Sequence, residues 1–334
     1  MKKKITRRTF LQIVAVAGAA GGCWQLGLFT GDARLQVARR SQPIMGTYLN
    51  LTVYGKDRDA CEAAIDRTIS RMKGLEAILS RHMPTSQVAT LNSTGRLDSP
   101  DKDLLELLGL SAGLSERSDG AFDVTILPVM NAHSEFAGKY ADSSGAITQA
   151  RTATGYRYLA ANASSVQFQK TGMGITLDGI GKGYIVDQGV AALKAAGFHN
   201  VCVDAGGDLM VAGAKPDGSP WRIGIRNPRI EQPMEPVSVK VINRAVATSG
   251  DYFQPYTADF RNHHILDPRT GFSSPDLASC TITAPTVGLA DGLATAVMAL
   301  GRDTGLELLE SLDGCEGYLI DKQQRNSHSS GFFS

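Results

Sequence analysis

The sequence has almost no net charge and few cysteines. Its 34 Lys and Arg residues nearly balance its 33 Asp and Glu residues, which leaves a formal net charge of +1. Beyond the first ten positions the basic residues are scattered, so we exclude nucleic acid as a partner. The five cysteines form no CxxC pair, and neither a zinc site nor a disulfide framework is indicated. We expect Cys61, Cys202, Cys280 and Cys315 to be buried thiols.

The sequence also shows no internal repeat, and its apolar run at 13–20 is too short to span a bilayer. This run follows Arg7-Arg8-Thr9-Phe10-Leu11, a pattern typical of a twin-arginine (Tat) export signal. We therefore predict a periplasmic protein that is exported by the Tat pathway. Two alternatives stay open for the leader: Cys23 carries a lipid that anchors the chain to the inner membrane, or a peptidase cuts after a small residue near Ala19.

The composition indicates a folded protein. With 334 residues, of which 43% are hydrophobic and 20% charged, the chain can form one large domain or two lobes in close contact. We predict a leader and linker at 1–42, a single functional domain at 43–325 and a C-terminal tail at 326–334. The polar, Gly- and Ser-rich stretch 134–149 is expected to be a loop between the two halves.

Hydrophobic periodicity predicts the main helices and strands. Helices are expected at 58–79, 104–114, 184–196 and 289–300, the last one ended by Gly301. Strands are expected at 44–54, 174–178, 201–208, 221–225, 237–247 and 280–283.

Two oxygen-bearing side chains stand out on the apolar helix 289–300. Asp291 and Thr295 are one turn apart, so both point the same way. A helix that is apolar nearly all round is usually buried, and a carboxylate and a hydroxyl in a dry site form part of a site for a hard cation such as Mg2+. The alternative is structural, with Thr295 bonded to its own preceding turn and Asp291 paired with an Arg.

A glycine-rich turn precedes the helix 184–196. It contains Gly179, Gly181, Lys182 and Gly183. Backbone N–H groups at a helix N-terminus attract anions, and Lys182 adds positive charge, so the turn is a candidate phosphate cradle. Its spacing fits neither the P-loop nor the Rossmann fingerprint.

Three further polar residues are candidates for the site. Asp123 either accepts bonds from a heterocycle or caps a helix. His263 and His264 are adjacent, so in an extended segment they point to opposite faces. We assign His264 to the chemistry and His263 to solvent.

Taken together, these pieces resemble the ApbE family of FAD:protein FMN transferases. The motifs occur in the family's order and span residues 43–320. They are MGTYLNLTV (45–53), DGAFDVT (119–125), LDGIGKGYIVD (177–187), GGDLMVAG (206–213), PDGSPWRIGI (216–225), ATSGDY (247–252), HHILDPRTG (263–271) and ADGLAT (290–295).

The resemblance implies an α+β fold of the ApbE, T-fold-like architecture, in which mixed, largely antiparallel sheets pack against helices. It implies an enzyme that uses Mg2+, cleaves FAD, attaches FMN through a phosphoester bond to a Thr or Ser of an acceptor protein, and releases AMP. The acceptor would be a flavoprotein subunit of a membrane or periplasmic redox complex. The implied metal ligands are Asp291, Thr295 and the carbonyl of Gly179, and the implied FAD contacts are Met45, Ala121, Phe122, Asp123, Thr176, Lys182 and Leu266.

Two other functions stay open. An FAD pyrophosphatase, which converts FAD to FMN and AMP, would share every residue and differ only in using water as the nucleophile. A non-catalytic periplasmic FAD-binding protein would need no metal, and the pair Asp291 and Thr295 argues against it. For transfer, His264 is our candidate general base, because the pKa of an ordinary imidazole is ~6.5, close to the working pH. Its alternative role is to orient Asp267 or the loop, in which case Asp251 or Asp123 is the next candidate.

Overall fold

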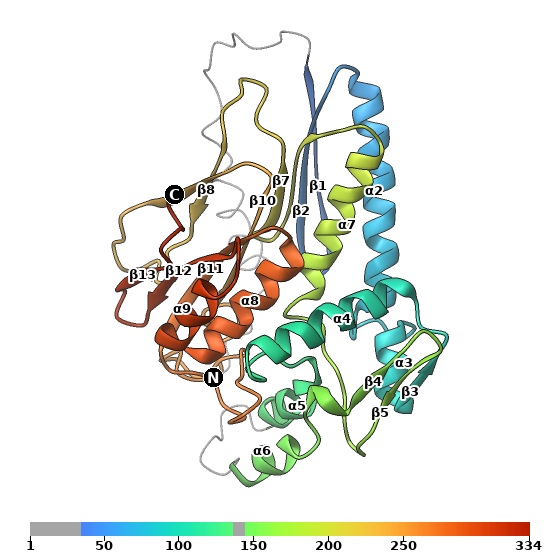
Figure 1. Ribbon diagram of the computed structural model, residues 1–334, viewed down its shortest axis with the longest axis vertical. Helices are drawn as coiled ribbons and strands as arrows, with labels where there is room; N and C mark the ends of the chain where they lie inside the picture. Colours follow the sequence, from blue (N-terminus) through green and yellow to red (C-terminus); the bar gives the residue numbers. More distant parts are fainter. Residues whose placement is uncertain (1–34, 136–143) are drawn as a thin grey trace, which may run out of the picture. The chain divides into compact units, whose positions relative to one another are not determined.

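An eight-stranded sheet forms the centre of the computed structural model, which describes residues 35–135 and 144–334. All neighbouring strands in it are antiparallel, and Figure 1 shows them crossing the molecule. In spatial order they are β1 (Gln36–Ile44), β2 (Thr47–Gly55), β6 (Asn200–Ala205), β7 (Asp208–Ala212), β10 (Arg244–Gly250), β11 (Leu277–Ala284), β12 (Glu316–Asp321) and β13 (Asn326–His328).

Helices cover one face of this sheet. Helix α7 packs between α2 and α8, and α9 packs against α8 and β12; Figure 1 shows α2 and α7 side by side along the strands. The helices are α2 (Arg58–Leu79), α3 (Gln87–Thr94), α4 (Lys102–Arg117), α5 (Leu127–Glu135), α6 (Ser144–Arg151), α7 (Gly181–Ala195), α8 (Val287–Leu300) and α9 (Arg302–Glu310), with 3-10 turns η1 (Val124–Ile126) and η3 (Tyr156–Tyr158).

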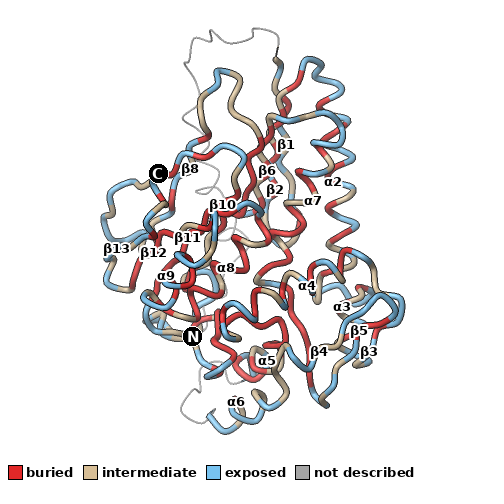
Figure 2. Tube along the Cα trace, in the orientation of Figure 1, coloured by how far each residue is buried: buried red, intermediate tan, exposed pale blue. Residues whose placement is uncertain are grey.

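The opposite face of the sheet is covered by a hairpin of β8 (Trp221–Ile225) and β9 (Val237–Val241). Because side chains alternate along a strand, Leu209 and Val211 of β7 pack with Trp221, while Met210 and Ala212 join the core under the helices. Strand β11 is buried at every residue because both of its faces are covered, and Figure 2 shows this buried interior. A smaller sheet of β3 (Arg96–Asp98), β5 (Ser165–Phe168) and β4 (Leu159–Ala161) lies apart from it.

The predicted α+β class is confirmed, and several predicted elements are found at their expected places. Helix α2 has the predicted limits, and Asp57 caps it by accepting hydrogen bonds from the N–H groups of Asp59 and Ala60. Helix α8 is ended by Gly301, whose positive φ of 83° glycine adopts without strain. Three of the four predicted thiols, Cys61, Cys280 and Cys315, are buried, whereas Cys202 is half-buried.

The sheet extends beyond both predicted limits of the domain. The predicted start at residue 43 falls inside β1, and β13 lies within the predicted tail 326–334. Helix α5 reaches Glu135 and helix α6 begins at Ser144, so both extend into the predicted loop 134–149. The predicted strand 237–247 is two strands, β9 and β10, because the chain turns at Asn243, where φ is 50°. Residues 174–177 belong to no strand of the described sheets and a turn begins at Asp178, contrary to the predicted strand 174–178.

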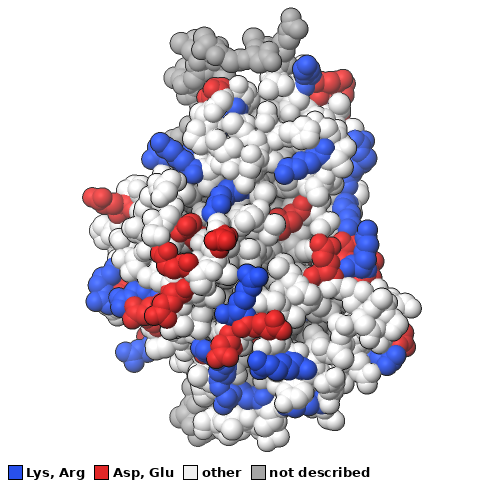
Figure 3. All heavy atoms as spheres, viewed as in Figure 1, with Lys and Arg blue, Asp and Glu red and all other residues white. Residues whose placement is uncertain are grey.

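The surface carries charges of both signs. Figure 3 shows acidic and basic side chains interspersed over the visible face, as the balanced composition leads us to expect. Within residues 35–135 and 144–334, no helix has the length and hydropathy needed to cross a membrane. The Arg7-Arg8 motif and Cys23 lie outside the described residues.

The close packing of α7 on α8 predicts a large effect of adding one methyl group. A Cβ at Gly183 would lie 2.5 Å from the carbonyl oxygen of Val287, a backbone atom that cannot swing away. We expect Gly183→Ala to lower the free energy of unfolding by roughly 1–3 kcal/mol, measured by urea denaturation. The control is Gly74→Ala in α2, where nothing lies within 4 Å of the added Cβ; it should be stabilising by roughly 0.5–1 kcal/mol. Equal stability of the two variants would contradict this account of the helix contact.

Candidate active site

One cleft is lined by all the residues that the sequence analysis assigned to the metal, to FAD contacts or, as first candidate, to the general base. Its volume is about 380 Å³, within the range of roughly 300–1,000 Å³ usual for small-molecule sites. The predicted residues that line it are Met45, Ala121, Phe122, Asp123, Thr176, Gly179, Lys182, His264, Leu266, Asp291 and Thr295.

Part of the cleft is built from turns at one end of the large sheet. The β1–β2 turn contributes Met45 and Gly46, which have φ values of 51° and 69°. A two-residue hairpin turn with positive φ at both positions matches the twist of the strands, but it is unusual for methionine and marks a constrained position. The backbone N–H of Met45 donates to Glu76 Oε1 of α2 at 2.9 Å, which holds this turn against the helix.

Two carboxylates connect α7 and α8 in opposite directions. Asp187 of α7 accepts hydrogen bonds from the N–H groups of Val287 and Gly288 at the start of α8, both at 2.8 Å. In return, Asp291 of α8 accepts one from the N–H of Gly183 at the start of α7, at 3.0 Å. Carboxylates are favourable at helix N-termini, where unpaired N–H groups and the helix dipole meet. These reciprocal hydrogen bonds fix the register of the two helices and turn Asp291 toward the cleft.

Three oxygen-bearing groups that can coordinate a cation lie near the contact between α7 and α8. The Thr295 hydroxyl donates to the Gly179 carbonyl at 3.4 Å and lies 3.4 Å from the Ser249 hydroxyl, while Asp291 is 6% exposed one turn earlier on α8. The structural alternative for the pair is not what we observe, because Asp291 has a backbone N–H as its partner and Thr295 bonds to another segment. A carboxylate, a hydroxyl and a carbonyl suit Mg2+, which prefers oxygen ligands. Among the described residues no group of three or more His, Cys, Asp or Glu side chains could hold a metal, so such a site would rest on these mixed donors.

The side chains around Asp291 carry more negative than positive charge, which favours the binding of a cation. Lys182 forms an ion pair with Asp208, which is 2% exposed and accepts a hydrogen bond from the Thr248 N–H. Burial, followed by the charge of Asp208, raises the pKa of Asp291 far above its usual range, and Lys182 offsets this only in part. For Lys182, burial lowers the pKa, but the carboxylates of Asp208 and Asp291 more than reverse that effect. One lysine therefore faces more than one carboxylate.

The predicted phosphate cradle is less open than its sequence indicates. The Gly181 N–H donates to the Leu177 carbonyl at 2.7 Å, and the Gly183 N–H is the donor to Asp291. Two of the N–H groups expected to bind an anion are therefore already paired. Lys182, which lines the cleft and is paired with Asp208, is the positive side chain nearest to this turn.

Asp123 fulfils the structural role proposed for it and also borders the cleft. Its Oδ1 accepts bonds from the Thr125 N–H at 2.8 Å and hydroxyl at 2.7 Å, which caps η1. Its Oδ2 accepts a bond from the Tyr156 N–H at 2.7 Å. Burial raises the pKa of this carboxyl.

Of the two adjacent histidines, one lies where we predicted and the other does not. His264 is half-buried and lines the cleft, as expected, and burial lowers its pKa. His263, assigned to solvent, is fully buried. The ring stays neutral because Nδ1 accepts a hydrogen bond from the Ile265 N–H at 3.3 Å and Nε2 lies 3.3 Å from the Ser274 carbonyl, to which it donates. The prediction that the two rings point to opposite faces is correct. The face away from the cleft, however, is covered by residues 273–274 and not by water.

Other cleft residues were not identified from the sequence. Asp178, Asp208, Phe253 and Gln254 line the cleft, and Asp251, the reserve candidate for the base, does not. A signal was present for Asp208, since it follows Gly206-Gly207, and a Cβ on Gly206 would lie 2.4 Å from the Thr47 hydroxyl. Glycines in a strand-like run often mark a place where another segment or a ligand approaches closely.

The chain is similar to known proteins over nearly its whole described length. The model of the ApbE family matches residues 45–319. FAD:protein FMN transferase from Treponema pallidum is 30% identical over 96% of this chain and 92% of its own, and the protein of that name from Haemophilus influenzae is 30% identical over 89% of each. The crystal structure of the Pseudomonas stutzeri flavinyl transferase ApbE, apo form, superimposes with a TM-score of 0.78 at 30% identity and covers 92% of this chain and 99% of that one.

The buried His263 predicts a loss of stability in acid. Burial lowers its pKa to about 4, so between pH 6.5 and pH 4 the unfolded chain binds a proton that the folded chain does not, and stability falls as the pH falls. From pH 7 to pH 4.5 we expect the wild type to lose about 2 to 3 kcal/mol more than His263→Asn in urea denaturation. The control His199→Asn changes an exposed histidine and should keep the wild-type slope. Parallel curves for wild type and His263→Asn would refute the buried neutral ring.

Proposed function

The chain belongs to the ApbE family, and we propose that it is a magnesium-dependent FAD:protein FMN transferase. The observation that carries this proposal is the convergence of Asp291, Thr295 and the Gly179 carbonyl beside Lys182 in one cleft. The relatives named FAD:protein FMN transferase support the transferase activity.

The proposed reaction breaks the phosphoanhydride bond of FAD and forms a phosphoester bond. The hydroxyl of an acceptor Thr or Ser attacks the phosphorus on the FMN side of the pyrophosphate, a new phosphorus–oxygen bond forms, and the bond to AMP breaks. The hydroxyl proton passes to His264, which burial keeps neutral at working pH. Lys182 lies where its charge can balance the phosphate oxygens.

Mg2+ would be held by Asp291, Thr295 and Gly179. A bound Mg2+ would neutralise part of the phosphate charge and stabilise the charge that develops on the leaving oxygen. The chain's own part is to keep these oxygens in place: the Gly183 N–H orients the Asp291 carboxylate, and the Gly179 carbonyl orients the Thr295 hydroxyl. A side chain at residue 179 would come within 3.1 Å of the Thr295 hydroxyl, so glycine keeps the space between these donors open.

The acceptor is proposed to be a flavoprotein subunit of a membrane or periplasmic redox complex, and the Arg7-Arg8 motif is proposed to export the enzyme to the same compartment. Cys23 is a proposed lipid anchor. We expect Arg7→Lys with Arg8→Lys to leave folded precursor in the cytoplasm, because the export receptor reads the paired arginines. Cell fractionation with an immunoblot measures this, and normal periplasmic accumulation of the double variant would eliminate Tat export.

Removing the charge of Asp291 should separate activity from folding. In Asp291→Asn one amide oxygen can still accept the bond from Gly183, so the melting temperature should change little, while Mg2+-dependent turnover should fall ~10²-fold or more. Both kcat and the FAD dissociation constant must be measured, because the cation would also bridge protein and phosphate. The matched control is Asp313→Asn, which changes an exposed carboxylate. Wild-type turnover of Asp291→Asn at saturating Mg2+ would rule out the ligand role.

The role of His264 as a base predicts a change in the pH profile of turnover. His264→Ala should lower kcat ~10²-fold with FAD affinity nearly kept. In the wild type, kcat should fall in acid as the ring is protonated, below the ordinary ~6.5 because burial lowers the pKa. This acidic limb should be absent from His264→Ala and present in the control His199→Ala. Its survival in His264→Ala would show that the ring only orients the loop.

A further inference from the structure

The segment 251–264 carries three residues into the cleft but contains little regular structure of its own. It leaves the end of β10, and Phe253, Gln254 and His264 on it line the cleft. Its internal support is a single bridge between Pro255 and His263, a few backbone hydrogen bonds, including His264 N–H to the Gln254 carbonyl at 3.1 Å, and the side-chain bonds of Thr257 and Asp259. Contacts with other parts of the chain add to this support, and His263 is bonded to Ser273.

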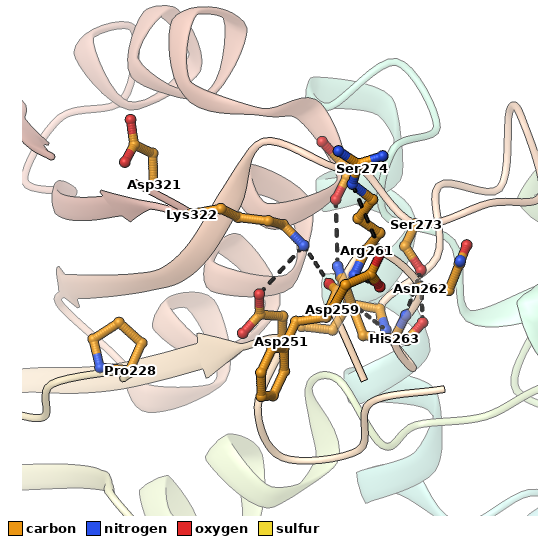
Figure 4. Close-up of polar contacts among 12 residues, drawn as sticks. Pro228, Asp251, Asp259, Arg261, Asn262, His263, Ser273, Ser274, Asp321 and Lys322 are labelled. Atoms are coloured by element: carbon orange, nitrogen blue, oxygen red, sulfur yellow. Dashed lines mark hydrogen bonds and ion pairs between the residues drawn. The ribbon is translucent and has the colours of Figure 1, made fainter. Parts of the chain in front are cut away.

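Two cations from other parts of the chain meet the first residue of the segment. Asp251 has no exposed surface. Its two oxygens accept hydrogen bonds from Arg229 at 2.8 and 2.7 Å, in the bidentate geometry that guanidinium favours, and Lys322 lies 3.3 Å from Oδ2 (Figure 4). Arg229 lies between β8 and β9, and Lys322 follows β12. The side chains of both cations are nearly buried, at 12% and 10% exposure.

The same two cations reach the far turn of the segment. Lys322 Nζ donates to the carbonyl of Phe260, and the Arg229 guanidinium lies 4.2 Å from the centre of the Phe260 ring, a cation–π distance. Phe260 has a φ of 59°, which is uncommon for an aromatic residue and requires support from its surroundings. Arg229 and Lys322 thus connect the start of the segment to its turn, and His264 follows that turn.

The arrangement is not explained by stability alone. Two nearly buried cations share the buried carboxylate of Asp251, and Asp259, which also acts on Lys322, is largely exposed. Burial lowers the pKa of Lys322, and Asp251 only partly opposes this. Buried ion pairs contribute little net stability, because desolvation offsets their attraction. They do penalise any conformation that separates the charges, so they select one arrangement of the segment.

We propose that Arg229 and Lys322 are positioning residues that act through Asp251 and Phe260 to hold the segment 251–264 so that His264 faces the cleft. This inference rests on the proposed function for its activity readout. Met45, Thr176 and Lys182 lie on other elements, so FAD binding should depend on the two cations far less than turnover does.

The first test measures kcat and FAD affinity in Arg229→Gln and Lys322→Gln. We expect kcat to fall ~10-fold to 100-fold in each, because small misplacements of a reacting group cost that much, while the FAD dissociation constant changes less than ~3-fold. Lys322→Arg, which keeps the charge, should recover most of kcat. Arg325→Gln is the control, since Arg325 also pairs with a buried carboxylate, Asp321, but its side chain is 69% exposed and does not touch the segment; it should keep wild-type kcat. Unchanged kcat in both Gln variants, or an equal loss of FAD affinity, would overturn the proposal.

A double-mutant cycle tests whether the effect passes through His264. In a His264→Ala background, Arg229→Gln and Lys322→Gln should each lower kcat by less than ~2-fold, since the group they position is gone. Full multiplicative losses would overturn the proposal. If Arg229→Gln does not fold, Lys322→Gln carries the test, because it leaves the bidentate pair in place.

A readout independent of transfer separates this proposal from the proposed function. The imidazole signals of His264 in the NMR spectrum, assigned with His264→Ala, should shift or broaden in both Gln variants and remain as in the wild type in Arg325→Gln. A wild-type protein that binds FAD but transfers nothing would refute the proposed function, and the His264 signals would still decide the positioning role. Unchanged signals in both Gln variants would overturn it.

Discussion

The site depends on reciprocal hydrogen bonds between α7 and α8, in which a carboxylate on each helix accepts from N–H groups at the start of the other. Asp187 satisfies N–H groups at the start of α8, and Asp291 satisfies one at the start of α7. These contacts require the helices to approach so closely that only glycine fits at residue 183. Because each helix provides the cap of the other, neither can slide along its axis without leaving buried N–H groups unpaired. The position of Asp291 in the cleft is therefore a consequence of helix packing, and Thr295 follows one turn later.

The antiparallel sheet supplies the other side of the cleft. Strands β2, β6, β7 and β10 are neighbours, so the β1–β2 turn, the β6–β7 turn and the end of β10 all come to one end of the sheet. Residues far apart in the sequence, such as Met45, Asp208 and Ser249, meet there. The segment after β10 closes this end and is held from outside by Arg229 and Lys322. Helices α7 and α8 thus carry Lys182 and two residues of the proposed cation site, while the candidate base is on a segment that we propose is held in place by these two cations.

The sequence predicts most where the physical signal is local or where several motifs agree. Helices α2 and α8 have clear ends, and the eleven residues predicted for the site, most of them in the ordered ApbE-like motifs, all line one cleft. Long-range packing escapes prediction. Strand β1 is polar and half-exposed because it is an edge strand, so its sequence does not predict a core strand. The burial of His263 depends on Ser273 and Ser274, which only the folded chain brings close to it.

The central claim is that the cleft transfers FMN to a protein hydroxyl rather than to water. Incubation of the protein with FAD, Mg2+ and a candidate acceptor flavoprotein, followed by intact mass measurement of the acceptor, tests it most directly. The account predicts that the acceptor gains the mass of FMN less one water and that AMP appears in equal amount. An acceptor of unchanged mass, with FMN and AMP both free in solution, would contradict it and identify an FAD pyrophosphatase.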